Sequence, residues 1–301
     1  MKVVITGANS AVGQAILRCG NGQEAATNTF VAAVRSARAA EQIRSQFGNA
    51  HGVVQISYDD PGSLGDAFQS ASAVIHLAGL LVERPDSTYE QANVASTRSV
   101  VEAAKRSPVQ KLVLVSATGA DETSANRYYR TKGEAESLVR GSGLCYTVLR
   151  APLLLGRGTA GAAGLMRHLG CEKAKLIGGG RNLQQPLYVE DLARAAVAAT
   201  QSSVADNLVL DLVGPVSLPE RELVERAALF LGRQVRIGSI SKRWLSLLLS
   251  LRQRFGKAGF SRDALEVITA DTRLDSQPAV RALGIQLTGI DEMIKDSLGQ
   301  G

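Results

Sequence analysis

A glycine-containing turn lies directly between an apolar strand and a helix in the first thirteen residues. The strand ends at Thr6-Gly7, and a helical pattern begins next to Gly13. Glycines here permit a tight turn and a close approach of the backbone to a phosphate, while the helix start supplies unpaired N–H groups and the positive dipole end. The sequence therefore predicts a nucleotide-binding turn. Its predicted residues are Gly7, Asn9, Ser10, Ala11, Val12 and Gly13, with Ser10 where such turns often carry another glycine.

Strand-like and helix-like segments alternate through the first half of the chain. The predicted strands are residues 3–6, 30–34, 53–56, 73–77, 111–116 and 145–149, and the predicted helices are residues 12–18, 37–47, 62–69, 89–106 and 128–140. Continuously apolar strands that alternate with helices predict a parallel sheet covered on both faces. Such a sheet binds its ligand beyond the carboxyl ends of its strands. The predicted fold class is α/β, a doubly wound parallel sheet of the Rossmann type.

The pattern changes after Arg150. Residues 156–181 are rich in glycine and alanine with little periodicity, whereas a helix at 189–200 and a strand at 207–212 are expected to return to the sheet. We therefore predict a dinucleotide-binding domain of residues 1–155, joined again by about 189–213. Residues 156–188 and 214–301 are predicted to form a smaller substrate-binding lobe.

Charge and cysteine content exclude several function classes. The net charge is +6, but residues 233–262 hold eight basic and no acidic residues, so the rest of the chain is mildly acidic. One localised basic region does not indicate nucleic-acid binding. Three separated cysteines without a CxxC pair predict reduced, buried thiols, and the absence of a signal-peptide pattern predicts a cytoplasmic location. Three scattered histidines predict no metal site.

The second predicted strand ends at basic residues. Arg35, Ser36 and Arg38 stand where an acidic residue would hold the ribose hydroxyls of NAD, and a guanidinium suits a 2′-phosphate. This favours NADP as cofactor, with NAD as the alternative. After the third strand, Asp59 and Asp60 are expected to border the adenine, and Asp60 also suits the N-cap of the next helix.

The fourth predicted strand ends at His76-Leu77-Ala78-Gly79. Leu77, Ala78 and Gly79 are expected to let the cofactor backbone pass. His76 is predicted to be a cofactor-side or packing residue and not a catalyst.

Tyr128 and Lys132 lie four residues apart on a predicted helix and therefore share one face. An ammonium beside a phenol favours the phenolate, which suits proton transfer near neutral pH. The spacing is common in helices, so its significance depends on the phosphate-binding turn at the start of the chain.

Together these residues resemble the short-chain dehydrogenase/reductase superfamily, in its extended or atypical branch of NAD(P)-dependent epimerases and dehydratases. The resemblance covers about two-thirds of the chain, which is also similar to the accessory NAD(P)H-binding subunit of respiratory complex I and bacterial relatives of it. The residues that carry it, in family order, are Thr6-Gly7 to Gly13, His76-Leu77-Ala78-Gly79, Asn93, Val115-Ser116, Tyr128-x-x-x-Lys132, and residues 149–156 and 185–193.

The resemblance implies a role for each residue of a catalytic set. Tyr128 would be the general acid or base on a substrate oxygen, and Lys132 would lower the pKa of the tyrosine and bind the nicotinamide ribose. Thr118 is favoured as the hydroxyl that positions the same oxygen, with Ser116 as the alternative. Asn93 would support the helix and a proton-relay water. The interval from Thr118 to Tyr128 is short for an extended member.

The expected function is that of an NADP(H)-dependent oxidoreductase acting on an alcohol or carbonyl of a small molecule. A nucleotide-sugar epimerase or dehydratase, and a non-enzymatic NADP(H) sensor or assembly factor, are the alternatives. Pro152 and Leu153 are further predicted cofactor contacts. Leu153, Leu154, Leu165 and Met166 favour an apolar substrate if they do not belong to the core. The sequence leaves open whether the protein is a monomer or a homodimer.

Residues 242–255 form a basic segment with the pattern of an amphipathic helix. Such a helix caps an active site, attracts an anionic substrate or rests peripherally on a membrane. The favoured interpretation is different: the leucines pack on the lobe, and the arginines are solvated.

Overall fold

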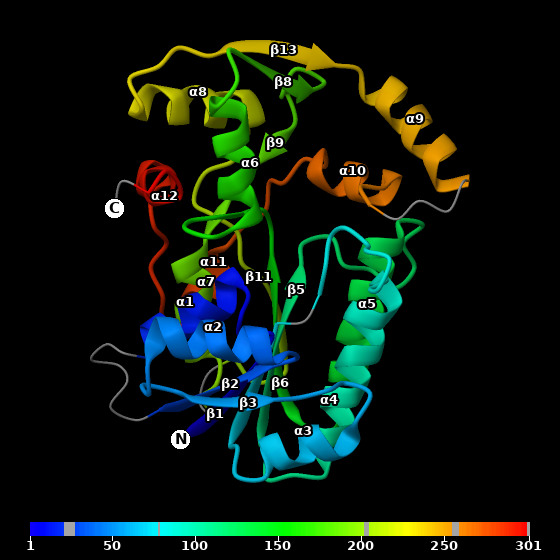
Figure 1. Ribbon diagram of the computed structural model, residues 1–301, viewed down its shortest axis with the longest axis vertical. Helices are drawn as coiled ribbons and strands as arrows, with labels where there is room; N and C mark the ends of the chain where they lie inside the picture. The colour runs from blue at the N-terminus through cyan, green and yellow to red at the C-terminus, as the bar shows by residue number, and fades with distance from the viewer. Residues whose placement is uncertain (21–27, 78, 202–204, 255–258, 300–301) are drawn as a thin grey trace.

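Seven parallel strands form the main sheet of the computed structural model, which describes residues 1–20, 28–77, 79–201, 205–254 and 259–299 (Figure 1). Their order is β3-β2-β1-β4-β5-β6-β11. The strands are β1 (Lys2–Thr6), β2 (Thr29–Val34), β3 (Gly52–Gln55), β4 (Ala73–His76), β5 (Lys111–Ala117), β6 (Cys145–Ala151) and β11 (Leu208–Asp211). The order reverses between β1 and β4, which is where the ligand crevice of such sheets opens. The predicted doubly wound sheet is confirmed.

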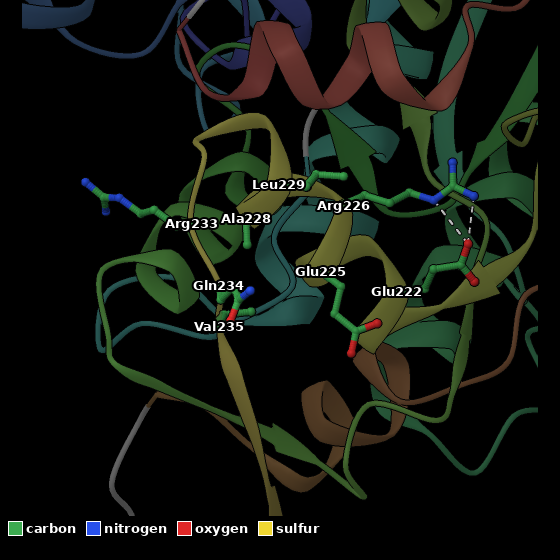
Figure 2. A pocket seen from close by; sticks show the side chains of 8 residues that line it. All are labelled: Glu222, Glu225, Arg226, Ala228, Leu229, Arg233, Gln234 and Val235. Carbon is green, nitrogen blue, oxygen red and sulfur yellow. Dashed lines mark hydrogen bonds and ion pairs between the residues drawn. The ribbon is translucent and has the colours of Figure 1, made fainter.

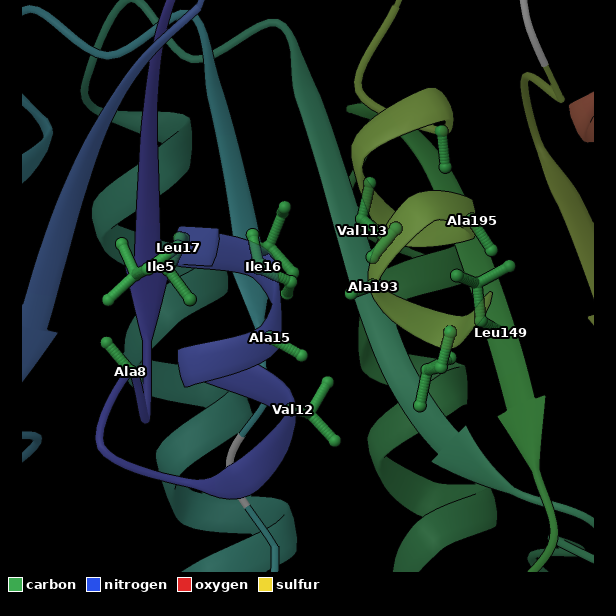
Figure 3. Packing of buried hydrophobic residues seen from close by; sticks show 14 of the residues in the cluster. Ile5, Ala8, Val12, Ala15, Ile16, Leu17, Val113, Leu149, Ala193 and Ala195 are labelled. Atoms are coloured by element: carbon green, nitrogen blue, oxygen red, sulfur yellow. The ribbon is translucent and has the colours of Figure 1, made fainter. Parts of the chain in front are cut away.

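Helices cover both faces of this sheet. One face packs against α1 (Ala11–Cys19), α2 (Ala37–Phe47), α7 (Val189–Ala198) and α11 (Gln277–Leu283), and the other against α3 (Pro61–Phe68), α4 (Ser96–Lys105) and α5 (Arg127–Arg140). Successive strand residues point to opposite faces, so Val3 and Ile5 belong to the first cluster and Val4 to the second. Figure 3 shows Ile5 among the apolar side chains of α1.

Four of these helices begin at a side-chain cap. Ser10, Ser36, Asp60 and Asn126 each accept a hydrogen bond from a backbone N–H in the first turn of α1, α2, α3 and α5. Each cap satisfies a donor that has no partner inside the helix. The predicted starts of these four helices lie within one residue of the observed ones, and Asp60 is the cap that the sequence predicted.

The predicted helix at 89–106 is divided into two parts. Residues Glu90–Ala95 are a π-helix, η2, which continues into α4. The hydroxyls of Ser96 and Thr97 donate to the carbonyls of Ala92 and Asn93, four residues earlier, at 2.7 and 2.6 Å. Such bonds compete with the regular ladder, and π-bulges are frequent at functional sites.

A second cluster of elements surrounds its own apolar core, centred on Leu155, Leu165, Leu176 and Met293. The helices that contribute to this core are α6 (Ala160–Leu169), α8 (Glu220–Phe230) and α12 (Ile290–Ser297). Helices α9 (Lys242–Arg254) and α10 (Arg262–Ile268) contact each other, and α10 also contacts α5. The short strands pair as β7 (Leu154–Leu155) with β10 (Leu187–Tyr188), β8 (Lys173–Ile177) with β13 (Arg236–Ile240), and β9 (Leu183–Gln184) with β12 (Leu218–Pro219). The division into two domains stays a prediction, because α11 from the C-terminal part packs on the main sheet.

The cysteines differ from their prediction. Cys145 and Cys171 are exposed and Cys19 is half-buried, so the predicted burial of the thiols is wrong. Cys145 is the first residue of β6, and Cys171 follows the end of α6, where side chains reach solvent. Among the described residues, no helix has the length and apolar character needed to cross a membrane.

Candidate active site

The turn between β1 and α1 has the geometry of a phosphate-binding turn. Gly7 has a φ of 74°, and its N–H donates to the carbonyl of Ala33 on β2 at 3.2 Å. A Cβ on Gly13 would lie 2.5 Å from the Cα of Ala8, so only glycine lets the helix start this close to the strand. The Ser10 hydroxyl accepts from the Gly13 N–H at 3.1 Å and keeps its own proton for a ligand. Asn9 and Ser10 are exposed, Ala11 is half-buried and Val12 is buried.

Basic side chains stand at the carboxyl end of β2. Arg35 and Arg38 are exposed, and neither forms an ion pair with any residue in the described part of the chain. The Ser36 hydroxyl accepts from the Ala39 N–H at 3.2 Å and is the N-cap of α2. At the end of β3, Asp60 caps α3 as predicted, because its Oδ1 accepts from the Gly62 N–H at 2.9 Å. Asp59 is exposed.

The end of β4 lies beside polar side chains of η2 and α5. The Leu77 N–H donates to the Thr6 carbonyl at 3.2 Å, and Ala78 lies outside the described residues. Gly79 has a φ of 155°. A Cβ on Gly79 would lie 3.0 Å from Lys132 Nζ and 3.1 Å from Asn93 Oδ1. These two polar atoms therefore converge over a position that glycine keeps free.

Lys132 is buried, and its ammonium donates to the carbonyl of Val115 on β5 at 3.2 Å. Burial lowers the pKa of Lys132 to about 8, and the opposing charge of Glu136 raises it. Arg150 in turn pairs with Glu136 at 2.7 Å. The fold therefore holds a lysine with an unusually low pKa at the carboxyl end of the sheet.

Tyr128 does not have the lowered pKa that the resemblance implied. Burial raises its pKa, and the neighbouring phenols of Tyr129 and Tyr89 raise it further. The Tyr128 ring meets the Tyr89 ring edge-on at 5.8 Å and the Tyr129 ring at 5.7 Å. The Lys132 ammonium donates to the Val115 carbonyl, and it is not among the groups that shift the pKa of the Tyr128 phenol.

Two buried polar atoms at the site lack a hydrogen-bond partner within the described ranges. They are Asn93 Oδ1 and Ser116 Oγ. Asn93 Nδ2 donates to the Thr131 hydroxyl at 2.9 Å, so its Oδ1 is held facing the site. An unpaired buried acceptor costs about 1–3 kcal/mol, and such atoms in a native protein fit a site that a ligand or water completes. Thr118 is half-buried, and its N–H donates to the Ala151 carbonyl at 3.1 Å.

His76 is a structural residue. It is fully buried, with Nδ1 2.6 Å from the Thr6 hydroxyl and Nε2 3.1 Å from the Thr97 hydroxyl. Burial, and next the charge of Lys132, lowers its pKa to about 3, so the ring is neutral at physiological pH. Its two hydrogen bonds connect β4 with β1 and with α4.

The short segment between Thr118 and Tyr128 lies directly on α5. The Asp121 N–H donates to the Tyr129 carbonyl at 3.1 Å, and a Cβ on Gly119 would lie 3.0 Å from the Tyr129 ring. Tyr129 thus occupies the space beside this turn, while Tyr128 faces Tyr89.

The sequence did not indicate the contacts that α10 makes with the start of α5. The Asn126 amide donates to the Asp263 carbonyl at 3.1 Å, and the Arg127 N–H donates to the Asp263 carboxylate at 3.2 Å. The Tyr89 hydroxyl donates to the Leu81 carbonyl at 2.8 Å and lies 3.4 Å from the Ser261 hydroxyl. Asn126 was recognisable as a cap, but partners more than 130 residues away leave no local signal.

The predicted apolar substrate residues divide into two groups. Leu165 is buried in the core of the lobe together with Leu155, so its interpretation as a substrate contact is wrong. Leu153 and Met166 are exposed by 36% and 44%, and Leu154 is half-buried. Pro152 is half-buried directly after β6.

A hollow of about 550 Å³ lies on α8 and the segment that follows it (Figure 2). Glu222, Glu225, Arg226 and Arg233 are among its lining residues. Its lining includes none of the residues of the candidate site, so the hollow is separate from that site.

A protein-family model described as NAD(P)H-binding matches residues 7–203. The chain belongs to this NAD(P)H-binding family. The match includes the glycine turn, Lys132 and Asn93, so the cofactor class agrees with the geometry. The choice between NADP and NAD is a separate question, which concerns Arg35 and Arg38.

Two curated relatives are similar to part of the chain. Subunit 9 of the NADH dehydrogenase [ubiquinone] 1 alpha subcomplex from Arabidopsis thaliana is 30% identical over 181 residues, 58% of this chain and 44% of that protein. Ceramide reductase from Caulobacter vibrioides is 26% identical over 177 residues, 59% of this chain and 56% of that protein. The chain spans about half the length of these relatives.

The fold is also that of solved epimerase structures. UDP-glucuronic acid 4-epimerase from Bacillus cereus, solved with UDP-glucuronic acid and NAD, superposes with a TM-score of 0.77 at 15% identity, over 100% of this chain and 98% of that one. At this identity the similarity shows the fold alone.

Proposed function

We propose that this protein is an NADP(H)-dependent reductase of the short-chain type that acts on the carbonyl of a small, apolar substrate. The observation that carries the proposal is the convergence of Lys132 Nζ and Asn93 Oδ1 over Gly79, with the unpaired Ser116 hydroxyl nearby in β5. Three polar groups at the carboxyl end of a nucleotide-binding sheet suit a cofactor ribose and a substrate oxygen. Bound NADPH would supply the hydride.

Tyr128 would hold the proton that the substrate oxygen receives. Because burial raises the pKa of Tyr128, its phenol stays protonated at neutral pH, as the acid of a carbonyl reduction must. Lys132 would bind the cofactor ribose, and Asn93 Oδ1 would hold a water or a ligand hydroxyl. Thr118 is proposed to position the substrate oxygen, with Ser116 as the alternative.

Arg35 and Arg38 support NADP over NAD. Both guanidiniums are exposed at the end of β2 with no carboxylate pair among the described residues, so both are available to a 2′-phosphate. The similarity to ceramide reductase, over about half of each protein, favours a reductase over an epimerase and a substrate with apolar character.

The test is the substitution Tyr128→Phe, with Tyr129→Phe as the matched control on the same helix. We expect NADPH-dependent reduction of a panel of aliphatic and aromatic ketones to fall by about 10²–10⁴ in kcat for Tyr128→Phe, the usual contribution of a positioned acid. NADPH affinity, measured by the fluorescence of the bound nucleotide, should stay the same. Unchanged turnover in Tyr128→Phe, or an equal loss in Tyr129→Phe, would show that Tyr128 is not the acid.

A non-enzymatic NADP(H)-binding role is the second candidate. It is favoured by the similarity to subunit 9 of the NADH dehydrogenase subcomplex. Tight NADPH binding without consumption of NADPH on any ketone, aldehyde or nucleotide sugar would favour this role. Conversion of a nucleotide sugar without release of oxidised cofactor would indicate an epimerase.

A further inference from the structure

Helix α9 presents an apolar stripe to solvent. Trp244, Leu247, Leu248 and Leu251 are exposed by 64%, 62%, 41% and 49%. With 3.6 residues per turn, these positions fall within an arc of roughly 100° on one face of the helix. Leu249 is exposed by only 4% and lies on the opposite face. Figure 1 shows α9 at the margin of the molecule, beside α10.

The inner face of α9 is less apolar than the outer one. This face holds two leucines, Leu245 and Leu249, and two serines, Ser246 and Ser250, of which the serines and Leu245 are half-buried. The Ser250 hydroxyl donates to the Ser246 carbonyl at 2.9 Å. A surface helix of a globular domain normally has the reverse arrangement, with its apolar residues against the core. A contiguous exposed apolar patch indicates an interaction surface. The favoured sequence interpretation, that the leucines pack on the lobe, is therefore wrong for the stripe, whereas Leu249 is buried.

The charge around the stripe identifies the kind of partner. Lys242 and Arg243 are exposed in the first turn of α9, and neither forms an ion pair with a residue that the structure describes. Residues 226–262 contain no Asp or Glu. A symmetric contact with a second copy would bring these cations together without an acidic partner on the helix. Arg243 borders the stripe, and Lys242 lies in the same turn on the other side of the helix, so the start of α9 is basic. This charge and the stripe together complement an anionic, apolar surface.

We propose that α9 docks the protein on an anionic lipid bilayer. Trp244 and the three exposed leucines would enter the headgroup region, and Arg243, at the edge of the stripe, would contact lipid phosphates. A helix of 13 residues is about 20 Å long, too short for a bilayer core of about 30 Å, so α9 lies in the interface and does not cross it. The inference does not depend on the proposed reaction.

The test is sedimentation of the full chain with vesicles at low salt. One set is pure phosphatidylcholine, and the other contains a third phosphatidylserine. The variants are Trp244→Ser with Leu247→Ser, and Lys242→Gln with Arg243→Gln. The matched control is Leu229→Ser, which removes a leucine on α8 that is 77% exposed but lies beside Glu225 and Arg226. Circular dichroism confirms that each variant is folded.

We expect the wild type to bind the anionic vesicles and not the neutral ones. The apolar and the charge variants should each bind at least tenfold more weakly, and Leu229→Ser should bind like the wild type. Absence of binding to anionic vesicles, or equal binding by the apolar variant, overturns the proposal. A wild-type dimer that Trp244→Ser with Leu247→Ser dissociates, without vesicle binding, would overturn it too and would assign the stripe to a second copy.

Discussion

Replacement of Lys132 by methionine is expected to make the protein more stable at neutral pH while it removes activity. Lys132 is 6% exposed, and burial lowers its pKa from 10.5 to about 8. One pKa unit corresponds to about 1.4 kcal/mol, so this lowering of the pKa corresponds to about 3 kcal/mol. Keeping the Lys132 ammonium charged in the folded state lowers the free energy of unfolding by that amount. Methionine has a similar length and no charge, so it avoids this cost.

Part of the gain is offset by a lost hydrogen bond. The Lys132 ammonium donates to the Val115 carbonyl at 3.2 Å, and removal of such a bond costs about 1 kcal/mol. The expected net gain in the free energy of unfolding at pH 7 is therefore about 2 kcal/mol. Lys105→Met, on the exposed face of α4, is the matched control and should change stability by less than about 0.5 kcal/mol.

The pH dependence distinguishes this cause from better packing. Between pH 8 and pH 10.5 the unfolded chain binds more protons at Lys132 than the folded chain does, so the stability of the wild type rises with pH in this window. The advantage of Lys132→Met should therefore shrink to nearly zero by about pH 10. Urea unfolding of wild type and both variants at neutral pH and at the upper end of this window measures the change. A Lys132→Met protein that is less stable than wild type at neutral pH, or an advantage that is independent of pH, would refute the reasoning.

Two further predictions concern the cofactor site. Gly13→Ala should lower stability by about 1–3 kcal/mol and abolish NADPH binding, because its Cβ would overlap the Ala8 backbone. Gly65→Ala, with open space around the new methyl, should not destabilise in thermal unfolding. Arg35→Ala should weaken NADPH binding about 10–100-fold and NADH binding much less, since a charged hydrogen bond contributes about 1.5–3 kcal/mol. Arg44→Ala on α2 is its control in fluorescence titration, and an equal loss for both nucleotides would contradict a 2′-phosphate contact.

Local signals made the sheet and the phosphate turn predictable. Gly7 and Gly13 lie next to the strand and the helix that require them, and Ser36, Asp60 and Asn126 mark helix starts within three residues of the bonds they make. Alternating apolar runs indicate parallel strands without any knowledge of distant partners. The α/β architecture was therefore accessible from short windows of sequence.

Residues 156–181 contain a helix and a strand that the sequence did not predict, because this segment lacks such local signals. Alanine and glycine carry little amphipathic contrast, so α6 has no clear apolar face in the sequence, although Thr159 caps it.

For the leucines of α9 the sequence predicts the helix but not the surroundings of its apolar face. Periodicity places Trp244 and Leu247 on one face, but it does not say whether that face meets the core or the solvent. Only the packing of α9 beside α10 decides this.

The position of Tyr128 depends on contacts between segments that are more than 130 residues apart in the sequence. At the start of α5, the Asn126 amide donates to the carbonyl of Asp263 on α10, and the Arg127 N–H donates to the Asp263 carboxylate. Tyr89, whose hydroxyl lies 3.4 Å from Ser261, meets the Tyr128 ring edge-on at 5.8 Å. The same α10 packs beside α9, the helix with the exposed apolar stripe. One short helix, α10, thus connects the surface proposed to dock on lipid with the helix that carries the candidate acid. This arrangement would bring an apolar substrate from the bilayer close to the site that is proposed to reduce it.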